Sequence, residues 1–133
     1  MAISTGATVT GSGTSVSSVA LTSWTPSAND LILVWVACRS GITATGVSGN
    51  GITFTKVIED LESPQNQCSL SLWRGMSASP SSGQITATLS GTANAAIAVA
   101  HRISGAITTG TNGAGAIGAS AIANTGATDT NAP

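Results

Sequence analysis

Few side chains of this sequence could carry out acid–base or nucleophilic chemistry, and none of them is accompanied by the partners that such chemistry requires. The only histidine, His101, could act as a general base, but it would need a nucleophile and an orienting acid. No G-x-S-x-G motif singles out one serine from the many. The neighbouring Arg102 suggests a strand end at the rim of a sheet. We therefore expect a structural or interface histidine, in a protein that is not an enzyme.

The acidic residues offer only a weak case for a metal site. Glu59, Asp60 and Glu62 form the single carboxylate cluster, and Ca²⁺ prefers oxygen donors of this kind. The D-x-D-x-D-G pattern of a calcium loop is missing, so we expect a solvated acidic loop or one that pairs with a basic patch on a partner. A zinc site would need a second pair of Cys or His ligands. No metal or other cofactor is expected.

The two cysteines, Cys38 and Cys68, both fall in expected strands. A disulfide between them is geometrically possible if those strands are neighbours. The N-terminal sequence has neither the basic start nor the apolar core of a signal peptide. Reduced, buried thiols are therefore favoured over a disulfide.

The large aromatic residues could bind a ligand or anchor an interface. A row of exposed tryptophans would suggest sugar stacking, as in carbohydrate-binding modules. Trp35 lies within the most apolar segment and is expected in the core. Trp73 has the opposite alternation from Cys68, Leu70 and Leu72, which read as the buried side of a half-buried strand. Trp73 therefore either faces outward as an interface anchor or covers the second face of a sandwich.

The composition indicates a protein subunit. Charged residues make up 7% of the chain, against roughly 25% in an ordinary soluble domain. The net charge of −1 and mean hydropathy of +0.32 argue against disorder of the whole chain. Four basic residues are too few for direct nucleic-acid binding. The longest apolar run, Leu31 to Cys38, is far shorter than the roughly 20 residues of a membrane span. With few charges to keep neighbours apart, association with other subunits is expected.

Strand patterns recur along the chain, while helix patterns are nearly absent. The run Leu31 to Cys38 is apolar on both alternating faces and predicts a central strand covered from two sides. Gly49-Asn50-Gly51 suits a tight hairpin. The expected strands are Ser15–Trp24, Leu31–Cys38, a short one at Val47, Ile52–Ile58, Cys68–Trp73, Ile85–Ser90 and Asn94–Ile103. This spacing predicts an all-β fold, an antiparallel β-sandwich or jelly roll of about 7–8 strands, with a closed barrel as the alternative.

Three regions are expected along the chain. Residues 1–14 form an N-terminal extension or first strand, residues 15–105 the β-sandwich domain, and residues 106–133 an extended Gly/Ala/Thr-rich C-terminal arm. Ordering the arm would cost roughly 1–2 kcal/mol per residue in backbone entropy. Its three isoleucines, Ile107, Ile117 and Ile122, cannot offset that alone. The arm is therefore either disordered in the free protein or ordered by adding to its own sheet or a neighbour's, and these isoleucines join Trp73 as interface candidates.

The chain contains, in order, S-W-T-P-S-A-N-D-L-I-L-V-W-V-A (residues 23–37), G-V-S-G-N-G-I-T-F-T-K-V (46–57), S-L-S-L-W-R-G (69–75) and A-H-R-I-S-G (100–105). These segments resemble a class of small β-sandwich proteins encoded in phage and prophage structural modules and in some bacterial surface proteins. The resemblance implies a jelly-roll-like virion component, such as a capsid decoration (cement) protein that sits as a trimer on the shell. It covers about residues 15 to 105.

One departure from that pattern concerns the C-terminal end, where a further hydrophobic strand is missing. We expect the resulting open edge to be filled by a neighbour's arm or by the segment from Ile3 to Val9. The function expected is that of a phage structural protein, assembled in the host cytoplasm without Sec export. Its partners would be the major capsid protein or other virion subunits, besides copies of itself. The alternative is a carbohydrate-binding or adhesion module of a fibre or a bacterial surface protein.

Overall fold

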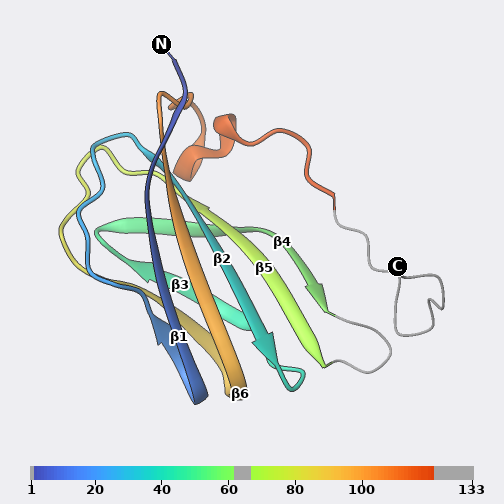
Figure 1. The fold of residues 1–133 in the computed structure, drawn as a ribbon. Coiled ribbons are helices and arrows are strands. Elements are labelled where there is room, and N and C mark those ends of the chain that lie inside the picture. The colour runs from blue at the N-terminus through green and yellow to red at the C-terminus, as the bar shows by residue number, and fades with distance from the viewer. Residues whose placement is uncertain (1, 62–66, 122–133) are drawn as a thin grey trace.

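The computed structural model describes residues 2–61 and 67–121, and this part of the chain is all-β (Figure 1). Short alternating runs of Val, Ile, Thr and Ser form most of the strands, as their β propensity favours. The elements are β1 (Ser4–Ala20), β2 (Leu31–Arg39), β3 (Ala44–Gly49), β4 (Ile52–Leu61), β5 (Cys68–Gly75), β6 (Ile85–Ser104) and a short 3₁₀ segment, η1 (Thr111–Ala116).

All strand pairings are antiparallel, and they close five strands into a barrel. The sheet order is β1-β6-β2-β5-β4-β3, and β3 also pairs with the first part of β6. β1 is an additional strand that runs along β6 (Figure 1). The all-β, antiparallel expectation is confirmed. The closed ring corresponds to the barrel that the sequence spacing left as the alternative to two packed sheets.

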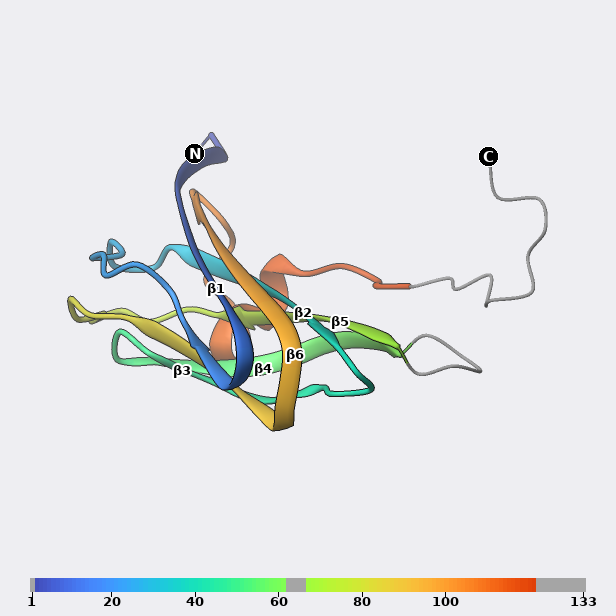
Figure 2. The same cartoon turned by 60° about the horizontal axis from the view of Figure 1, so that its bottom comes forward.

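The two long strands, β1 and β6, bend together at one corner, and each contributes to two layers. Ser15 has a φ of 53°, and the register between the strands jumps from Val16–Ala93 to Ser18–Thr88. Beyond the corner β1 returns across itself, so that the Thr22 N–H donates to the Thr10 carbonyl at 3.1 Å (Figure 2). Strands that change layer through bulges or bends are typical of orthogonally packed sheets.

This corner explains two differences from the expected strands. Residues 85–90 and 94–103 were expected as separate strands but form one bent strand, so the described chain has six strands. β1 begins at Ser4, so the region 1–14, expected as an extension or a first strand, is a strand and is continuous with the one expected from Ser15. From Ser4 onward, the segment expected to fill the open edge pairs with β6 within the same chain, and this corresponds to the second of the two ways expected for filling it.

The hairpin between β3 and β4 forms where the sequence predicts it. Asn50 and Gly51 have φ values of 53° and 63°, and Gly49 pairs with Ile52 across the turn. Two consecutive residues with positive φ match the twist of antiparallel strands. The Asn50 side chain is buried, and its amide donates to the Trp24 carbonyl at 3.0 Å, so the turn is tied to the strand layer beside it.

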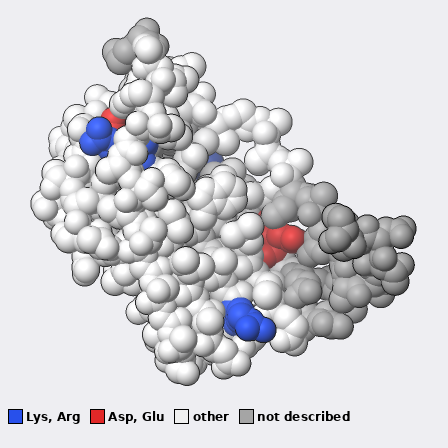
Figure 3. Space-filling model, in the orientation of Figure 1, with Lys and Arg blue, Asp and Glu red and all other residues white. Residues whose placement is uncertain are grey.

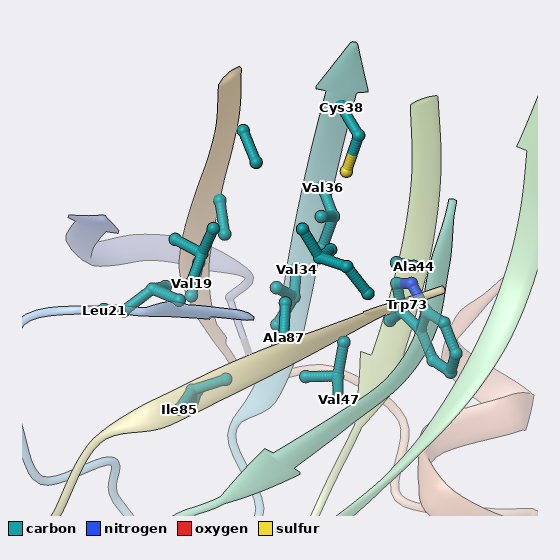
Figure 4. Packing of buried hydrophobic residues seen from close by; sticks show 14 of the residues in the cluster. Val19, Leu21, Val34, Val36, Cys38, Ala44, Val47, Trp73, Ile85 and Ala87 are labelled. Atoms are coloured by element: carbon teal, nitrogen blue, oxygen red, sulfur yellow. The ribbon is translucent and has the colours of Figure 1, made fainter. Parts of the chain in front are cut away.

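The core fills the barrel and the space under the corner (Figure 4). β2 directs Ile32, Val34 and Val36 inward, each with no exposed surface. Leu21 and Ile85, which are hydrogen-bonded to each other beyond the corner, are also fully buried. Each such side chain contributes roughly 1.5–3 kcal/mol through burial of its apolar surface.

The start of the C-terminal arm folds back onto its own sheet. η1 packs against β5 and β4, and the Asn112 amide donates to Thr55 Oγ1 at 3.2 Å. Gly113 is buried close to Leu31 and Met76. Within residues 105–121 the arm forms a short helical turn and no strand, so this part of it does not add to its own sheet, which was one of the alternatives expected. The rest of the arm, including Ile122, lies outside the described residues.

Candidate functional site

The cross-strand register places the larger apolar side chains of β5, β2 and β6 in rows on one side of the sheet. Leu70, Ala37 and Ile97 pair across the three strands in one row. Leu72, Trp35 and Val99 form the next row. We call this side of β5, β2 and β6 the outer face, because it points away from the barrel interior.

The outer face carries three exposed large apolar side chains. Trp35 is 37% exposed, Leu70 39% and Ile97 47%. They come from three neighbouring strands and lie in two adjacent rows, so they form one contiguous patch. Large contiguous apolar patches on a surface are typical of interaction sites, whereas isolated exposed apolar residues carry no such meaning.

The interior side of the same strands carries small residues instead. On β5, Ser69 and Ser71 are 5% and 2% exposed. On β6, Ala96, Ala98 and Ala100 are buried to a similar degree. The interior of a five-stranded barrel is narrow, and small side chains fill it best opposite the valines of β2. The larger alternating residues are consequently turned outward.

This arrangement corrects the expectation for two tryptophans. Trp73 is 6% exposed, and its indole N–H donates to Ser71 Oγ at 3.0 Å inside the barrel. It covers the interior, which is the second of the two roles expected for it, and it is not an outward anchor. Trp35, expected in the core, is the exposed one. The apolar run of β2 did not reveal which of its two faces would remain uncovered.

The outer face has almost no charge (Figure 3). Arg39 lies at its lower end on β2, and Asp60 flanks Leu70 from β4. Neither side chain forms an ion pair with a described residue, whereas Lys56 pairs with Glu59 and Arg102 with Asp30. These two charges have opposite sign and lie beside the apolar patch, and Arg74, which pairs with Leu33 in the row next to Trp35, is a third charged residue on this side of β5.

A hollow of about 530 Å³ adjoins the patch at the lower end of the outer face. Its lining includes the small residues Ala37 and Ala95 and the larger Ile97 and Arg39. Ser12 and Thr14 of β1 form another wall. We call this feature the larger hollow. No sequence pattern indicated this hollow, because its lining comes from four strands that are far apart along the chain.

The arm isoleucines lie at the opposite end of the sheet. Ile107 is 61% exposed, and Ile117 is half-buried. Both line a smaller hollow of about 270 Å³, together with Leu33 and Ile103. Leu31, beneath η1, is buried. The arm thus covers the upper end of the outer face and leaves Trp35 and the residues below it exposed.

The cysteines lie in neighbouring strands but on opposite sides of the sheet. Cys38 pairs with Ser69, and Cys68 pairs with Arg39, so the two thiols do not face each other. Both are free, Cys38 buried and Cys68 exposed. The possible disulfide is therefore not formed, and of the two thiols expected to be buried only one is. Burial raises the pKa of the Cys38 thiol, a hydrogen bond from Ser69 opposes this, and the Glu59 carboxylate adds to it.

The two thiols should differ in reactivity toward a thiol reagent such as dithionitrobenzoate. The thiolate is the reacting species, and both burial and a raised pKa reduce it at Cys38. We expect one fast thiol in the native protein and a second that reacts at least about tenfold more slowly, with both fast in denaturant. Cys68→Ser should remove only the fast phase. Loss of the slow phase in this variant would contradict the assignment.

The remaining candidates for chemistry are dispersed. His101 is exposed, and its Nδ1 lies 3.1 Å from Thr8 Oγ1. Glu59 is paired with Lys56, while Asp60 lies on the other side of β4, and Glu62 is outside the described residues. Among residues 2–61 and 67–121, no group of three His, Cys, Asp or Glu side chains could hold a metal ion. None of the helical segments described is long and apolar enough to cross a membrane.

Comparison with known protein families, with curated proteins and with solved structures gives no match for this chain. The resemblance to phage structural proteins remains a prediction from the sequence.

Proposed function

We propose that the chain is a non-catalytic structural subunit of a phage-type virion, a capsid decoration protein that stabilises the shell by bridging neighbouring subunits. The observation that carries this proposal is the outer face, where Trp35, Leu70 and Ile97 are exposed in adjacent rows. The proposed partners are the major capsid protein or other virion subunits, with the chain itself present as a homo-oligomer, a trimer in the resembled class.

The chemistry of the outer face suits contact with protein. The cores of protein interfaces are depleted of charge and enriched in aromatic and large apolar side chains. Here an exposed tryptophan has Leu, Ile and Ala among its neighbours, and the charged residues on this side are few: Arg39, Asp60 and Arg74. A partner that covers this patch would bury apolar surface at roughly 25 cal/mol per Å².

The jelly-roll topology of the resembled class is part of the same proposal. Its support is the corner at which β1 and β6 change layer, because jelly rolls also fold long antiparallel strands across two layers. A flattened barrel and a two-layer sandwich share this feature.

The proposal is tested on purified virus particles from the cells that make this chain. We expect the chain to co-sediment with particles in a fixed ratio to the capsid protein, and particles lacking it to lose infectivity at a lower temperature. Re-addition of the wild-type chain should restore heat resistance, whereas Leu70→Asp should not, because a carboxylate would be buried in the contact. A chain that never sediments with particles would contradict the proposal.

The alternative expected from the sequence, a carbohydrate-binding module, has weaker support. Sugar-stacking sites use coplanar exposed aromatic rings, and of the three tryptophans and one phenylalanine only Trp35 is exposed. Immobilised polysaccharides would retain the chain through Trp35 if this alternative were correct. Failure of Trp35→Ala to weaken such retention would exclude the stacking role.

A further inference from the structure

We infer that the outer face of β5, β2 and β6 binds a second copy of this chain. The proposed function places protein on this face, and the present inference rests on it to that extent. It goes further by naming the occupant of the face and the residues that make the contact. Three features of the face support it: its partial cover, its shape and its charges.

The first feature is the cover that the chain already provides for itself. η1 packs over the upper end of the face, where Leu31 is buried and Gly113 lies against it. The cover ends before Trp35, although the same apolar stripe continues down β2 to Ala37. The upper part of the stripe is thus covered by this chain's own small and apolar residues. A second copy would continue that cover with surface of the same composition.

The second feature is shape. The face bears protruding side chains, Trp35, Leu70 and Ile97, next to the larger hollow of about 530 Å³. Most of the residues that line the hollow are small, Ala37 and Ala95 among them, so small side chains leave this space open. A surface that carries both a protrusion and a recess can match a copy of itself, because the protrusion of each copy can enter the recess of the other.

The third feature is charge. Arg39 borders the larger hollow and Asp60 pairs with Leu70 on the other side of the patch. Neither side chain forms an ion pair within the described residues, whereas Lys56 pairs with Glu59 and Arg102 with Asp30. In a contact between two copies, Asp60 of each copy can pair with Arg39 of the other. Such marginal charges set the orientation and the specificity of a contact more than its affinity.

The inference leaves the number of copies to measurement, since both a pair and a ring of three can use this face. Sedimentation velocity of the full chain over a range of concentrations measures it. We expect reversible association for the wild type. Ile97→Thr and Leu70→Thr each place threonine, which has a high strand propensity, at an exposed strand position, so neither variant should unfold the chain. Each should weaken self-association at least about tenfold, because it removes apolar contact surface.

Ile107→Thr is the matched control. It makes the same chemical change at a more exposed isoleucine, which lies at the opposite end of the sheet. We expect this variant to associate like the wild type. Equal loss in Ile97→Thr and Ile107→Thr, or unchanged association in Ile97→Thr and Leu70→Thr, would overturn the inference. A chain that stays monomeric at the highest concentration measured would overturn it as well.

A charge exchange tests the contact independently of apolar packing. Arg39→Asp and Asp60→Arg should each self-associate more weakly than the wild type, because each variant brings like charges to both sides of the patch. Mixing the two variants should restore association, since one now supplies only cations there and the other only anions. Absence of recovery in the mixture would exclude pairing between Arg39 and Asp60 of different copies and would overturn the charge part of the inference.

The outcome is distinguishable from that of the proposed function. A monomeric chain that still sediments with particles would overturn the inference and leave the virion role intact. A chain that self-associates through the outer face but never binds particles would overturn the virion role and leave the inference intact.

Discussion

Replacing Ser71 by leucine is expected to destabilise the fold by about 3 kcal/mol or more, whereas replacing the adjacent Leu70 by serine should change stability by less than about 1 kcal/mol. Ser71 is 2% exposed and pairs with Val36 of the neighbouring strand β2 on the interior side, while Leu70 is 39% exposed on the other side of β5. A polar-to-apolar substitution is thus expected to do more harm than the reverse change next to it.

Two physical effects add up at Ser71. The extra carbon atoms have no free space in a narrow interior, and overpacking of this kind typically costs about 1–3 kcal/mol. The Trp73 indole N–H, which donates to Ser71 Oγ at 3.0 Å, also loses its acceptor while remaining buried. An unsatisfied buried donor costs a further 1–3 kcal/mol or so.

Urea unfolding followed by circular dichroism measures both variants. The protein concentration must be low enough that self-association does not contribute to the apparent stability. Ser71→Ala separates the two effects, because it removes the acceptor without adding volume, and should lie between the wild type and Ser71→Leu. A larger loss for Leu70→Ser than for Ser71→Leu would mean that β5 presents its other side to the core, and the outer face would have to be abandoned.

Local sequence patterns predicted the strands well where backbone preference alone decides the structure. The apolar run of β2, the Asn50-Gly51 turn and the alternating segments of β4 and β5 all appear close to their expected positions. Each depends on residues adjacent in the sequence, such as two positive φ values at one turn or a period of two along one strand.

The side of each strand that faces the core could not be predicted in the same way. Alternation shows that two sides differ, and the usual assumption places the larger apolar side chains inside. In β6 the interior side is Ala96, Ala98 and Ala100, and the larger Ile97 points outward. Which side fits depends on the radius of the barrel, and that radius is set by pairings between distant strands. The exposed patch was missed for this reason.

The bent strand β6 illustrates a related ambiguity. Residues around Gly91 have the small, polar composition of a turn, and the sequence therefore suggests two separate strands there. In the structure the chain bends at this position and continues in the next layer beside β1. Small residues favour turns and sharp bends alike, so only the partner strand distinguishes the two.

Gly11→Ala is expected to lower the free energy of unfolding by about 2–3 kcal/mol. Gly11 lies in β1 with ordinary strand dihedral angles, so an alanine there is not strained by its backbone conformation. Its Cβ atom would overlap the Ala20 carbonyl oxygen, where β1 returns across itself beyond the corner. A backbone oxygen cannot move aside as a side chain can, and the two halves of β1 would have to separate.

Gly46→Ala provides the matched control for this prediction. Gly46 is also a strand glycine, in β3, but a Cβ atom there meets nothing within 4 Å. Alanine should be neutral or stabilising by up to about 1 kcal/mol, because it reduces the entropy of the unfolded chain. If both glycine variants behaved alike, the tight return of β1 across itself would not exist in solution.

Hydrogen exchange shows where the lost stability of Gly11→Ala resides. β1 pairs only with β6 and is not needed to close the barrel, so its amides should lose protection before those of β2 and β5. The same substitution should also weaken self-association, because Ser12, Gly13 and Thr14 form one wall of the larger hollow. Gly46→Ala leaves that wall unchanged and should associate like the wild type. Together the two variants test whether the corner that shapes the fold also shapes the surface proposed to bind another copy.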